Sequence, residues 1–150
     1  MAATVLSIVA ATPAVADTSV ESRHRWRPHL AFPGETRGEL ALQFALEQMG
    51  KPYEYGGNGP DSYDCSGLTQ QAWGAVGVWI PRTSQDQADA GTGVPLSQVR
   101  PGDLVIFYAD ASHVGIYAGD GMVVVAPHEG AFIRLEPIAW MPVYAVRRPG

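Results

Sequence analysis

The pattern of apolar and polar positions divides this chain into a helical first part and a strand-rich second part. Residues 36–49 repeat apolar side chains at helical spacing on one face: Leu40, Ala41, Phe44, Ala45 and Met49. Thr36 and Glu39 have the spacing of a capping box, which typically opens a helix. Gly50 is a common residue type just past a helix end. The pattern therefore predicts a first helix over residues 36–49.

A second helix is predicted to begin at Cys65, because Asp64 before it is a favoured N-cap residue. This helix is expected to end near Gly74 or Gly77. Its inward-facing side chains are expected to be Leu68, Ala72 and Trp73. Residues 51–63, which are rich in Gly, Pro and Tyr, are expected to form an ordered loop before it.

A short third helix is predicted from Thr83 to Gly91, and the period of the pattern changes after it. Five short segments rich in Val, Ile and aromatic residues then predict strands: 103–108, 113–118, 122–126, 132–135 and 143–146. Gly119-Asp120-Gly121 separates two of them and is typical of a hairpin turn. Helices followed by a run of antiparallel strands predict an α+β domain, with N-terminal helices packed on a central antiparallel β-sheet.

The first residues have the features of an export signal. Residues 1–16 are almost wholly small and apolar, and they end in the sequence Ala-Val-Ala, which matches a cleavage site. A basic leading region is missing, so either the start lies upstream or the segment is a flexible apolar N-terminus. Residues 17–35 are polar and are interpreted as a linker, which leaves residues 36–150 as the folded domain.

Composition narrows the class of protein. The chain has 150 residues, of which 46% are hydrophobic and 17% charged, and this suits one soluble domain with a core. The net charge of −5 argues against a nucleic-acid binder, because such domains are usually basic. No apolar run approaches the ~18 residues of a membrane span, so none is expected. A monomer is expected.

Cys65 is the only cysteine, so it cannot form an internal disulfide. A thiolate attacks carbonyl carbons, but a free cysteine, with a pKa of about 8.5, is mostly protonated at neutral pH. The positive end of a helix and a nearby histidine would each favour the thiolate. Cys65 is therefore a candidate nucleophile, and the alternative is a buried, inert cysteine.

Four histidines could supply the base. His24 and His29 fall in the predicted linker, where solvated side chains are expected. His113 opens an apolar strand, where a rigid sheet could hold its ring still, although an ordinary strand-end histidine is the alternative. His128 follows Pro127 in a predicted loop.

Five short motifs occur in the order and near the spacing of one peptidase family. They are Tyr53–Gly57, Asp64–Leu68, Pro81–Gln85, Pro101–Leu104 and His113–Tyr117. In these motifs the chain resembles the NlpC-type peptidases of bacterial cell walls, which are papain-like cysteine endopeptidases. The resemblance covers roughly residues 38–148, and it implies a papain-like form of the α+β fold.

The resemblance also implies roles by position. Cys65 would be the nucleophile, His113 the general base, and the backbone N–H of Cys65 part of the oxyanion hole. Tyr53 matches a tyrosine whose hydroxyl lies near the reacting carbonyl, and Arg82 is expected to brace a loop. Three further positions match residues that hold the free amino group of a stem peptide in some members: Asp64, Ser66 and Ser84. Asp64 and Ser84 also have plain structural interpretations at helix starts.

One position departs from the family's pattern. Members usually carry a third polar residue twelve positions after the catalytic histidine, and here that position is Val125. Valine can neither orient an imidazole nor set its tautomer. His128 or Glu129 could substitute if Pro127 ends the strand, and a backbone carbonyl or a water could do so instead. Activity is expected to survive in reduced form.

Together these features predict an exported bacterial enzyme, secreted or held in the cell envelope. The expected partner is a peptidoglycan stem peptide, and the bond implied by the resemblance joins D-γ-glutamate to a diamino acid. Neither metal nor cofactor is expected. One alternative is a peptidoglycan-binding pseudoenzyme, for which Val125 is the motive. Another is a papain-like amidase or acyltransferase that uses the same Cys–His pair.

Overall fold

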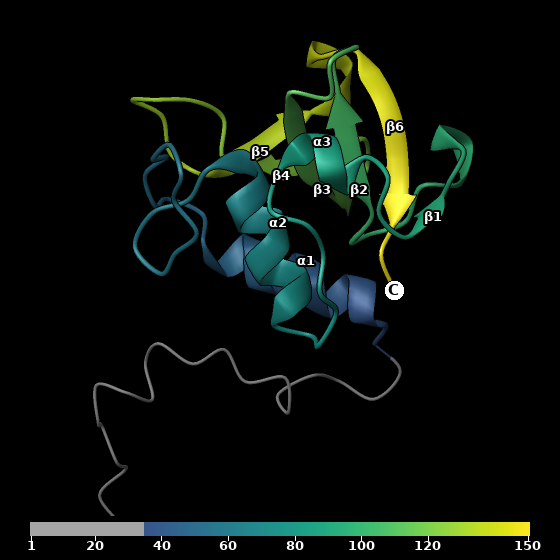
Figure 1. The fold of residues 1–150 in the computed structure, drawn as a ribbon, viewed down its shortest axis with the longest axis horizontal. Helices are drawn as coiled ribbons and strands as arrows, with labels where there is room; N and C mark the ends of the chain where they lie inside the picture. Colours follow the sequence, from purple (N-terminus) through teal and green to yellow (C-terminus); the bar gives the residue numbers. More distant parts are fainter. Residues whose placement is uncertain (1–34) are drawn as a thin grey trace, which may run out of the picture.

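Two helices lie against one face of a six-stranded antiparallel sheet (Figure 1). This computed structural model describes residues 35–150, so the predicted export signal and nearly all of the predicted linker lie outside the described residues. The helices are α1 (Arg37–Glu47), α2 (Cys65–Gly74) and α3 (Ser84–Gln87), with 3₁₀ turns at Leu96–Gln98 and Ile138–Trp140. The strands are β1 (Thr92–Gly93), β2 (Leu104–Phe107), β3 (His113–Gly119), β4 (Met122–Val125), β5 (Arg134–Pro137) and β6 (Val143–Arg148). The α+β class predicted from the sequence is confirmed.

The capping box predicted for α1 is present. The backbone N–H of Glu39 donates to Thr36 Oγ1 at 3.1 Å, and the N–H of Thr36 donates to Glu39 Oε2 at 2.8 Å. The predicted apolar face is partly wrong, because the buried hydrophobic residues of α1 are Ala41, Leu42 and Ala45. Small alanines let α1 pack closely on its neighbours, and Met49 lies beyond the helix end, where it is 44% exposed.

Helix α2 has the start predicted for it and the first of its two predicted ends. Asp64 is its N-cap, and its side chain accepts a hydrogen bond from the backbone N–H of Gly67 at 2.7 Å. Leu68, Ala72 and Trp73 are buried in the core, as predicted. Helix α3 is also capped as expected, by Thr83, but it ends at Gln87 rather than near Gly91. The fully buried Gln87 side chain, in the last residue of this short helix, donates to the carbonyls of Ser66 and Pro81.

The sheet carries apolar side chains on both faces, with strand order β1-β6-β2-β3-β4-β5. One face meets the helices and includes Leu104, Ile106, Val114, Ile116 and Val124. The other face carries Val105, Phe107, Val123 and Val125, over which loop residues such as Ile138 and Met141 pack. A strand buried on both faces has a continuous apolar sequence rather than an alternating one. This explains the unbroken apolar runs of β2 and β4.

Strand β5 begins two residues later than predicted. The N–H of Ile133 donates to the carbonyl of Lys51, and the N–H of Gly50 donates to the carbonyl of Ile133, both at 2.9 Å. Phe132 forms an isolated bridge with Pro52. Residues 132–133 therefore pair with the loop that follows α1 rather than with β4, and strand pairing with β4 starts at Arg134.

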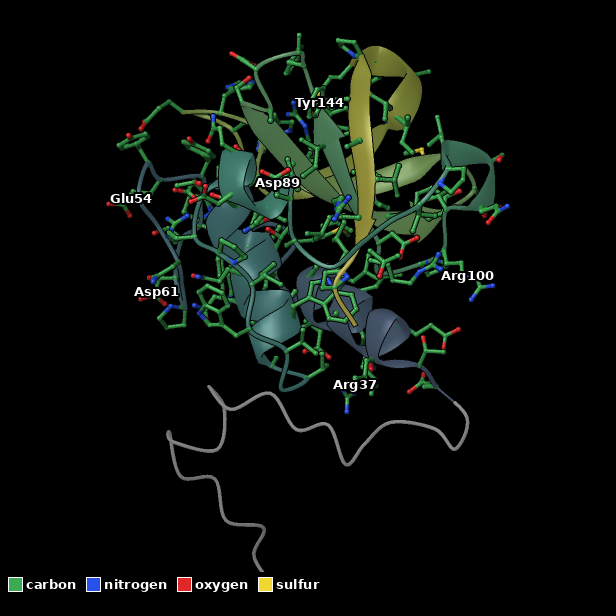
Figure 2. The ribbon with its side chains drawn as sticks, turned by 45° about the vertical axis from the view of Figure 1, so that its right-hand side comes forward. Arg37, Glu54, Asp61, Asp89, Arg100 and Tyr144 are labelled. Carbon is green, nitrogen blue, oxygen red and sulfur yellow. The ribbon has the colours of Figure 1, made fainter. Side chains whose placement is uncertain are left out.

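The predicted hairpin turn is confirmed between β3 and β4, where Gly119, Asp120 and Gly121 all have positive φ. Glu54, Asp89 and Tyr144 are exposed, and Figure 2 shows Glu54 at the edge of the molecule. Within residues 35–150, no helix combines the length and the apolar content needed to cross a bilayer.

Candidate active site

Cys65 opens onto a cleft of about 490 Å³ at the N-terminus of α2. Its thiol is free and half-buried. Five of the residues singled out from the sequence line this cleft together: Tyr53, Asp64, Cys65, Ser66 and Ser84. They come from the loop before α2, the first turn of α2 and the start of α3. The fold thus gathers them from segments separated by up to thirty-one positions in the sequence.

His113 lies at the edge of the same site, at the first position of β3. Its neighbour Ser112 lines the cleft, and the His113 side chain is only 8% exposed. The imidazole packs against Phe107, with ring centroids 5.7 Å apart and planes tilted by 31°. The next residue, Val114, presents its backbone N–H to the thiol of Cys65. The start of β3 and the start of α2 therefore meet at the sulfur.

The electrostatics of Cys65 differ from the sequence-based expectation. Burial raises the pKa of the thiol, and the neighbouring Asp64 carboxylate raises it further. The backbone N–H groups of Val114, Ser66 and Cys65 lower the pKa, but by less. The expectation that the helix start would leave a lowered pKa is therefore wrong for the resting site. Desolvation of the thiolate exceeds the help from the helix N-terminus.

Burial also lowers the pKa of His113, and the Glu136 carboxylate opposes this shift. The two shifts act together, since a raised thiol pKa and a lowered imidazole pKa both favour the uncharged pair. Both directions favour the uncharged forms, a thiol at Cys65 and a neutral imidazole at His113, and a neutral imidazole is the form that can accept a proton. A thiolate and an imidazolium would then form only when a substrate is attacked.

Tyr53 is placed to donate a hydrogen bond. Burial raises the pKa of its hydroxyl, and the nearby Cys65 and Asp64 raise it further. The phenol consequently stays protonated across the physiological range. A protonated hydroxyl in the same cleft as the thiol can stabilise negative charge that develops on a substrate oxygen.

Asp64 is held in an ion pair with Arg82. The Asp64 carboxylate accepts from the two terminal nitrogens of Arg82 at 2.7 and 2.9 Å, and from the N–H of Gly56 at 3.0 Å. Arg82 also donates to Ser66 Oγ at 2.9 Å and to the carbonyl of Gly57 at 3.3 Å. Arg82 thus ties the loop before α2 to the helix, and the charge of Asp64 is balanced.

Val125 occupies the position at which the family usually carries a third polar residue, and the structure places only its apolar side chain there. Val125 is fully buried on the same sheet face as Gly115 and contributes only methyl groups there. His128, which directly follows Pro127, is exposed, and its Nδ1 lies 2.9 Å from the carbonyl oxygen of Glu129. His128 is absent from the cleft lining, so its role as an orienting group stays a prediction.

Sequence reasoning left three residues of this region unassigned. Tyr55 and Ser112 line the cleft, and each lies within two residues of a position that was singled out. Adjacency could have found both. Glu136 acts on His113 from β5, two strands away, and only the strand pairing reveals this.

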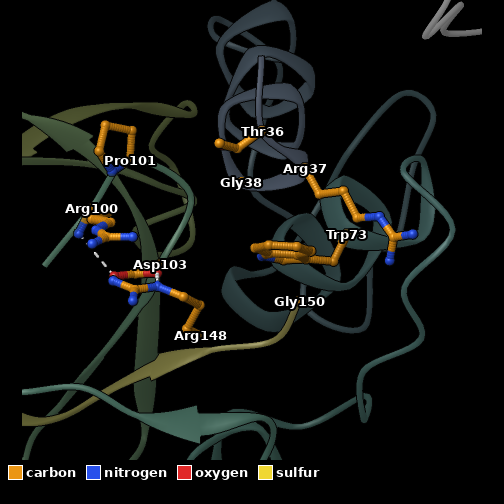
Figure 3. A pocket seen from close by; sticks show the side chains of 9 residues that line it. All are labelled: Thr36, Arg37, Gly38, Trp73, Arg100, Pro101, Asp103, Arg148 and Gly150. Atoms are coloured by element: carbon orange, nitrogen blue, oxygen red, sulfur yellow. Dashed lines mark hydrogen bonds and ion pairs between the residues drawn. The ribbon is translucent and has the colours of Figure 1, made fainter. Parts of the chain in front are cut away.

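A second hollow, of about 300 Å³, lies beside the N-terminus of α1 (Figure 3). Its lining includes Arg37, Trp73 and Arg100, with Asp103 held by Arg148 at 2.8 Å. No cysteine or histidine is among its lining residues. Among residues 35–150, no group of three or more His, Cys, Asp or Glu side chains is placed to hold a metal ion. Cys65 and Ser112, the residue before His113, both line the other cleft, so the two candidate reacting groups lie there and not at this hollow.

The sequence matches the profile of the NlpC/P60 family over residues 50–143. It is 42% identical over 118 residues to a probable endopeptidase of Corynebacterium glutamicum, covering 79% of this chain and 56% of that protein. It is 46% identical over 88 residues to the probable endopeptidase p60 of Listeria monocytogenes, covering 57% of this chain and 18% of that protein. The chain therefore spans about half the length, or less, of these curated relatives.

Comparison with solved structures agrees with this family match. NlpC2 from Trichomonas vaginalis superposes with a TM-score of 0.73 at 30% identity, over 79% of this chain and 48% of that one. The peptidoglycan hydrolase RipB from Mycobacterium tuberculosis gives a TM-score of 0.66 at 34% identity, over 75% of this chain and 64% of that one. The papain-like form of the α+β fold predicted from the motifs is confirmed.

Proposed function

This chain belongs to the NlpC/P60 family, and we propose that it is a cysteine-type endopeptidase that cleaves peptidoglycan stem peptides. One observation carries the proposal. The free thiol of Cys65, at the start of α2, lies against the backbone N–H of Val114, next to His113. A thiol and a buried neutral imidazole at one cleft are the groups that nucleophilic acyl transfer requires.

The chemistry follows from the uncharged resting pair. His113 takes the proton from Cys65 as the sulfur attacks the carbonyl carbon of the scissile amide, and a tetrahedral oxyanion forms. The imidazolium then gives its proton to the departing amine, the C–N bond breaks, and a thioester remains. Water attacks the thioester with His113 again as base. The acid is released and the thiol is restored.

Two donors are available for the oxyanion. The backbone N–H of Cys65 lies at the start of α2, where the helix dipole favours negative charge. The Tyr53 hydroxyl is protonated and lines the same cleft. Both are held by the fold before the substrate arrives, so little reorganisation is needed when charge develops.

For the substrate, the proposal assigns Asp64, Ser66 and Ser84 to the amino end of the stem peptide. Asp64 and Ser66 already share Arg82, so an incoming ammonium group meets a balanced ion pair rather than a bare carboxylate. The proposed bond is the one between D-γ-glutamate and a diamino acid. The proposed location is outside the cell or in its envelope, where peptidoglycan lies.

Digestion of purified peptidoglycan tests the function. The wild type is expected to release new muropeptides, each pair of products accounting for one cleaved amide by mass spectrometry, and Cys65→Ala is expected to release none. Val76→Ala, a change outside the cleft, serves as a control for handling and folding. Identical profiles from the wild type and Cys65→Ala would overturn the proposal.

A peptidoglycan-binding pseudoenzyme is the second candidate. The observation that favours it is the fully buried Val125 at the third polar position, together with the raised pKa of the Cys65 thiol. Sedimentation with insoluble peptidoglycan separates the two functions. Binding by the wild type without any product over a long incubation would favour the pseudoenzyme.

A further inference from the structure

The carboxylate of Asp64 is filled by hydrogen bonds from the protein itself. Its Oδ1 accepts from the backbone N–H of Gly67 at 2.7 Å, from Arg82 Nη1 at 2.9 Å and from Ser66 Oγ at 3.4 Å. Its Oδ2 accepts from the backbone N–H of Gly56 at 3.0 Å and from Arg82 Nη2 at 2.7 Å. An ionised carboxylate offers about four lone-pair sites. A further N–H group from a ligand would therefore have to displace one of these five bonds.

Displacing any of these donors is costly, because they come from three parts of the fold. Gly67 belongs to the first turn of α2, which Asp64 caps. The two bonds from Arg82 form a bidentate, charge-assisted pair, and such pairs are among the stronger hydrogen bonds. The same guanidinium also donates to Ser66 Oγ at 2.9 Å and to the carbonyl of Gly57 at 3.3 Å. An ammonium group that broke this network would uncap α2 and leave a carboxylate, with only 12% of its side chain exposed, without its partner.

The ion pair also cancels most of the attraction that Asp64 would exert on a substrate ammonium group. An ammonium that approaches the carboxylate meets the guanidinium of Arg82, whose Nη2 lies 2.7 Å from Oδ2. Two opposite charges this close act on a third charge almost as a neutral group. The other side chains that line the cleft carry hydroxyls, a thiol and one amide. Glu129, whose charge reaches Tyr53, is exposed to solvent and lies outside the cleft lining.

Neutral donors and acceptors at the start of α3 meet the amino end of a ligand instead. Ser84 Oγ donates to Gln85 Oε1 at 3.3 Å, so Ser84 can still accept and the Gln85 amide nitrogen can still donate. Thr83 Oγ1 accepts from the N–H of Asp86 at 3.2 Å and keeps its own proton to donate. This set suits an amide, which offers one N–H and one carbonyl and carries no charge. An ammonium group would lose its water here without gaining a counter-charge.

An exposed aromatic ring lies beside the same end of the cleft. Tyr55 lines the cleft and is 84% exposed, and the next residue, Gly56, donates its N–H to Asp64. The ring of a tyrosine is a flat apolar surface with a polar tip, which a sugar or another acyl substituent can cover. A group attached to the amino end of a stem peptide would extend from Asp64 toward Tyr55.

We propose that the cleft binds stem peptides whose amino end is acylated, as it is while the peptide is attached to the glycan, and this rests on the proposed function. Ser66 and Ser84 contact the neutral amide at that end. Asp64, filled by Arg82 and by the first turn of α2, shapes the wall of the cleft without binding an ammonium group. Tyr55 lies under the acyl substituent. A peptide with a free amine is then a poor substrate while its amine is charged.

Two tripeptides that differ only at the amino end test this. They are L-alanyl-D-γ-glutamyl-meso-diaminopimelate and its N-acetyl form, and both are also made with L-lysine as the third residue. The kcat/KM of the N-acetyl form is expected to exceed that of the free-amine form about tenfold at about pH 6.5. The ratio should fall toward one by about pH 9, because an α-amino group loses its proton around pH 7.7–8.0. Titration of Cys65 and His113 affects both substrates and cancels in the ratio.

Arg82→Gln is expected to reverse the preference. Without the guanidinium, Asp64 regains charge and free lone pairs, so the free-amine tripeptide should become the better substrate at about pH 6.5. A merely structural defect would lower both rates alike and leave their ratio unchanged. If Arg82→Gln does not fold, the pH series of the wild type decides alone.

The place of Tyr55 is tested with the tripeptide still joined to its disaccharide. Tyr55→Ala is expected to lower kcat/KM several-fold for this muropeptide and to change little for the N-acetyl tripeptide. Tyr144→Ala, which removes another exposed tyrosine from β6, is the matched control. Equal effects of Tyr55→Ala on the two substrates would contradict the place assigned to the ring.

Equal or faster cleavage of the free-amine tripeptide by the wild type at about pH 6.5, or a ratio that does not change with pH, would overturn the inference. The proposed function would still stand if purified peptidoglycan is digested. Calorimetric titration of Cys65→Ala with the two tripeptides measures the same preference without turnover. If the wild type cleaves neither the tripeptides nor peptidoglycan, the proposed function fails, while tighter binding of the N-acetyl form by Cys65→Ala supports the neutral amino end.

Discussion

Val125 fills the space that Gly115 leaves open, since a Cβ on Gly115 would lie 2.8 Å from Val125 Cγ1. Gly115 is two residues along β3 from His113, on the same face. The position where the family usually carries a polar residue is therefore correctly placed to act on the imidazole, but it carries methyl groups.

Val125→His is expected to raise kcat/KM several-fold, because an imidazole there can orient His113 and stabilise its charged form. Initial rates of muropeptide release check this. Val125→Leu adds bulk without polarity and is expected to give no gain, with a stability loss of about 1–3 kcal/mol from overpacking. An unchanged rate in Val125→His would mean that another group already fills the role.

The pH dependence of kcat/KM is expected to follow the neutral form of His113. Because burial lowers the pKa of His113, the acid limb of the profile should have its midpoint below about pH 6.5, the ordinary value for histidine. An acid limb centred above that value would contradict the neutral resting pair. The fold must be monitored in parallel. A group with a lowered folded pKa binds fewer protons in the folded state, so stability also falls as the pH drops through this window.

The rate of alkylation of Cys65 reports the pKa of its thiol, the partner of His113 in the proposed pair. Because burial and Asp64 raise the pKa of the thiol, its reaction with iodoacetamide should reach half its maximum rate above about pH 8.5, where a free cysteine does. Mass spectrometry of the single labelled site gives the rate. Fast labelling at pH 6 would instead indicate a preformed thiolate.

Tyr53→Phe is expected to lower kcat by about 100-fold, the usual cost of removing one oxyanion donor, with a smaller effect on KM. The phenol loses only its hydroxyl, so the packing of the ring is kept. Tyr144→Phe, on the exposed surface of β6, serves as the matched control. If both variants keep full activity, Tyr53 has no part in stabilising the oxyanion.

Two glycines of α2 should respond to alanine with opposite signs. A Cβ on Gly67 would collide with the backbone carbonyl of Gly57, which cannot move without disturbing the loop before Cys65. Gly67→Ala should therefore lower the free energy of unfolding by about 3 kcal/mol, at the upper end for overpacking. Gly74 meets nothing within 4 Å, and Gly74→Ala should raise the free energy of unfolding by up to about 1 kcal/mol. Urea unfolding measures both.

The sequence alone predicted many helix starts and turns of this molecule, because these features depend on residues that are close together in the chain. Helix starts depend on neighbouring residues, so Thr36 with Glu39, and Asp64 before Cys65, marked the beginnings of α1 and α2. Turns depend on backbone conformation, so Gly119-Asp120-Gly121 marked the hairpin. The prediction was wrong where structure depends on residues far apart in the chain. Strand β5 starts later than predicted because residues 132–133 pair with the loop after α1.

The same division holds for the site. Motif order and the spacing of Cys65 and His113 identified the family and the two candidate reacting groups, since those features lie along the chain. Only the tertiary structure decided that both groups are uncharged at rest, because desolvation depends on what surrounds a side chain rather than on what precedes it. It also decided that Val125 lies against Gly115, a relation created by the pairing of β3 with β4.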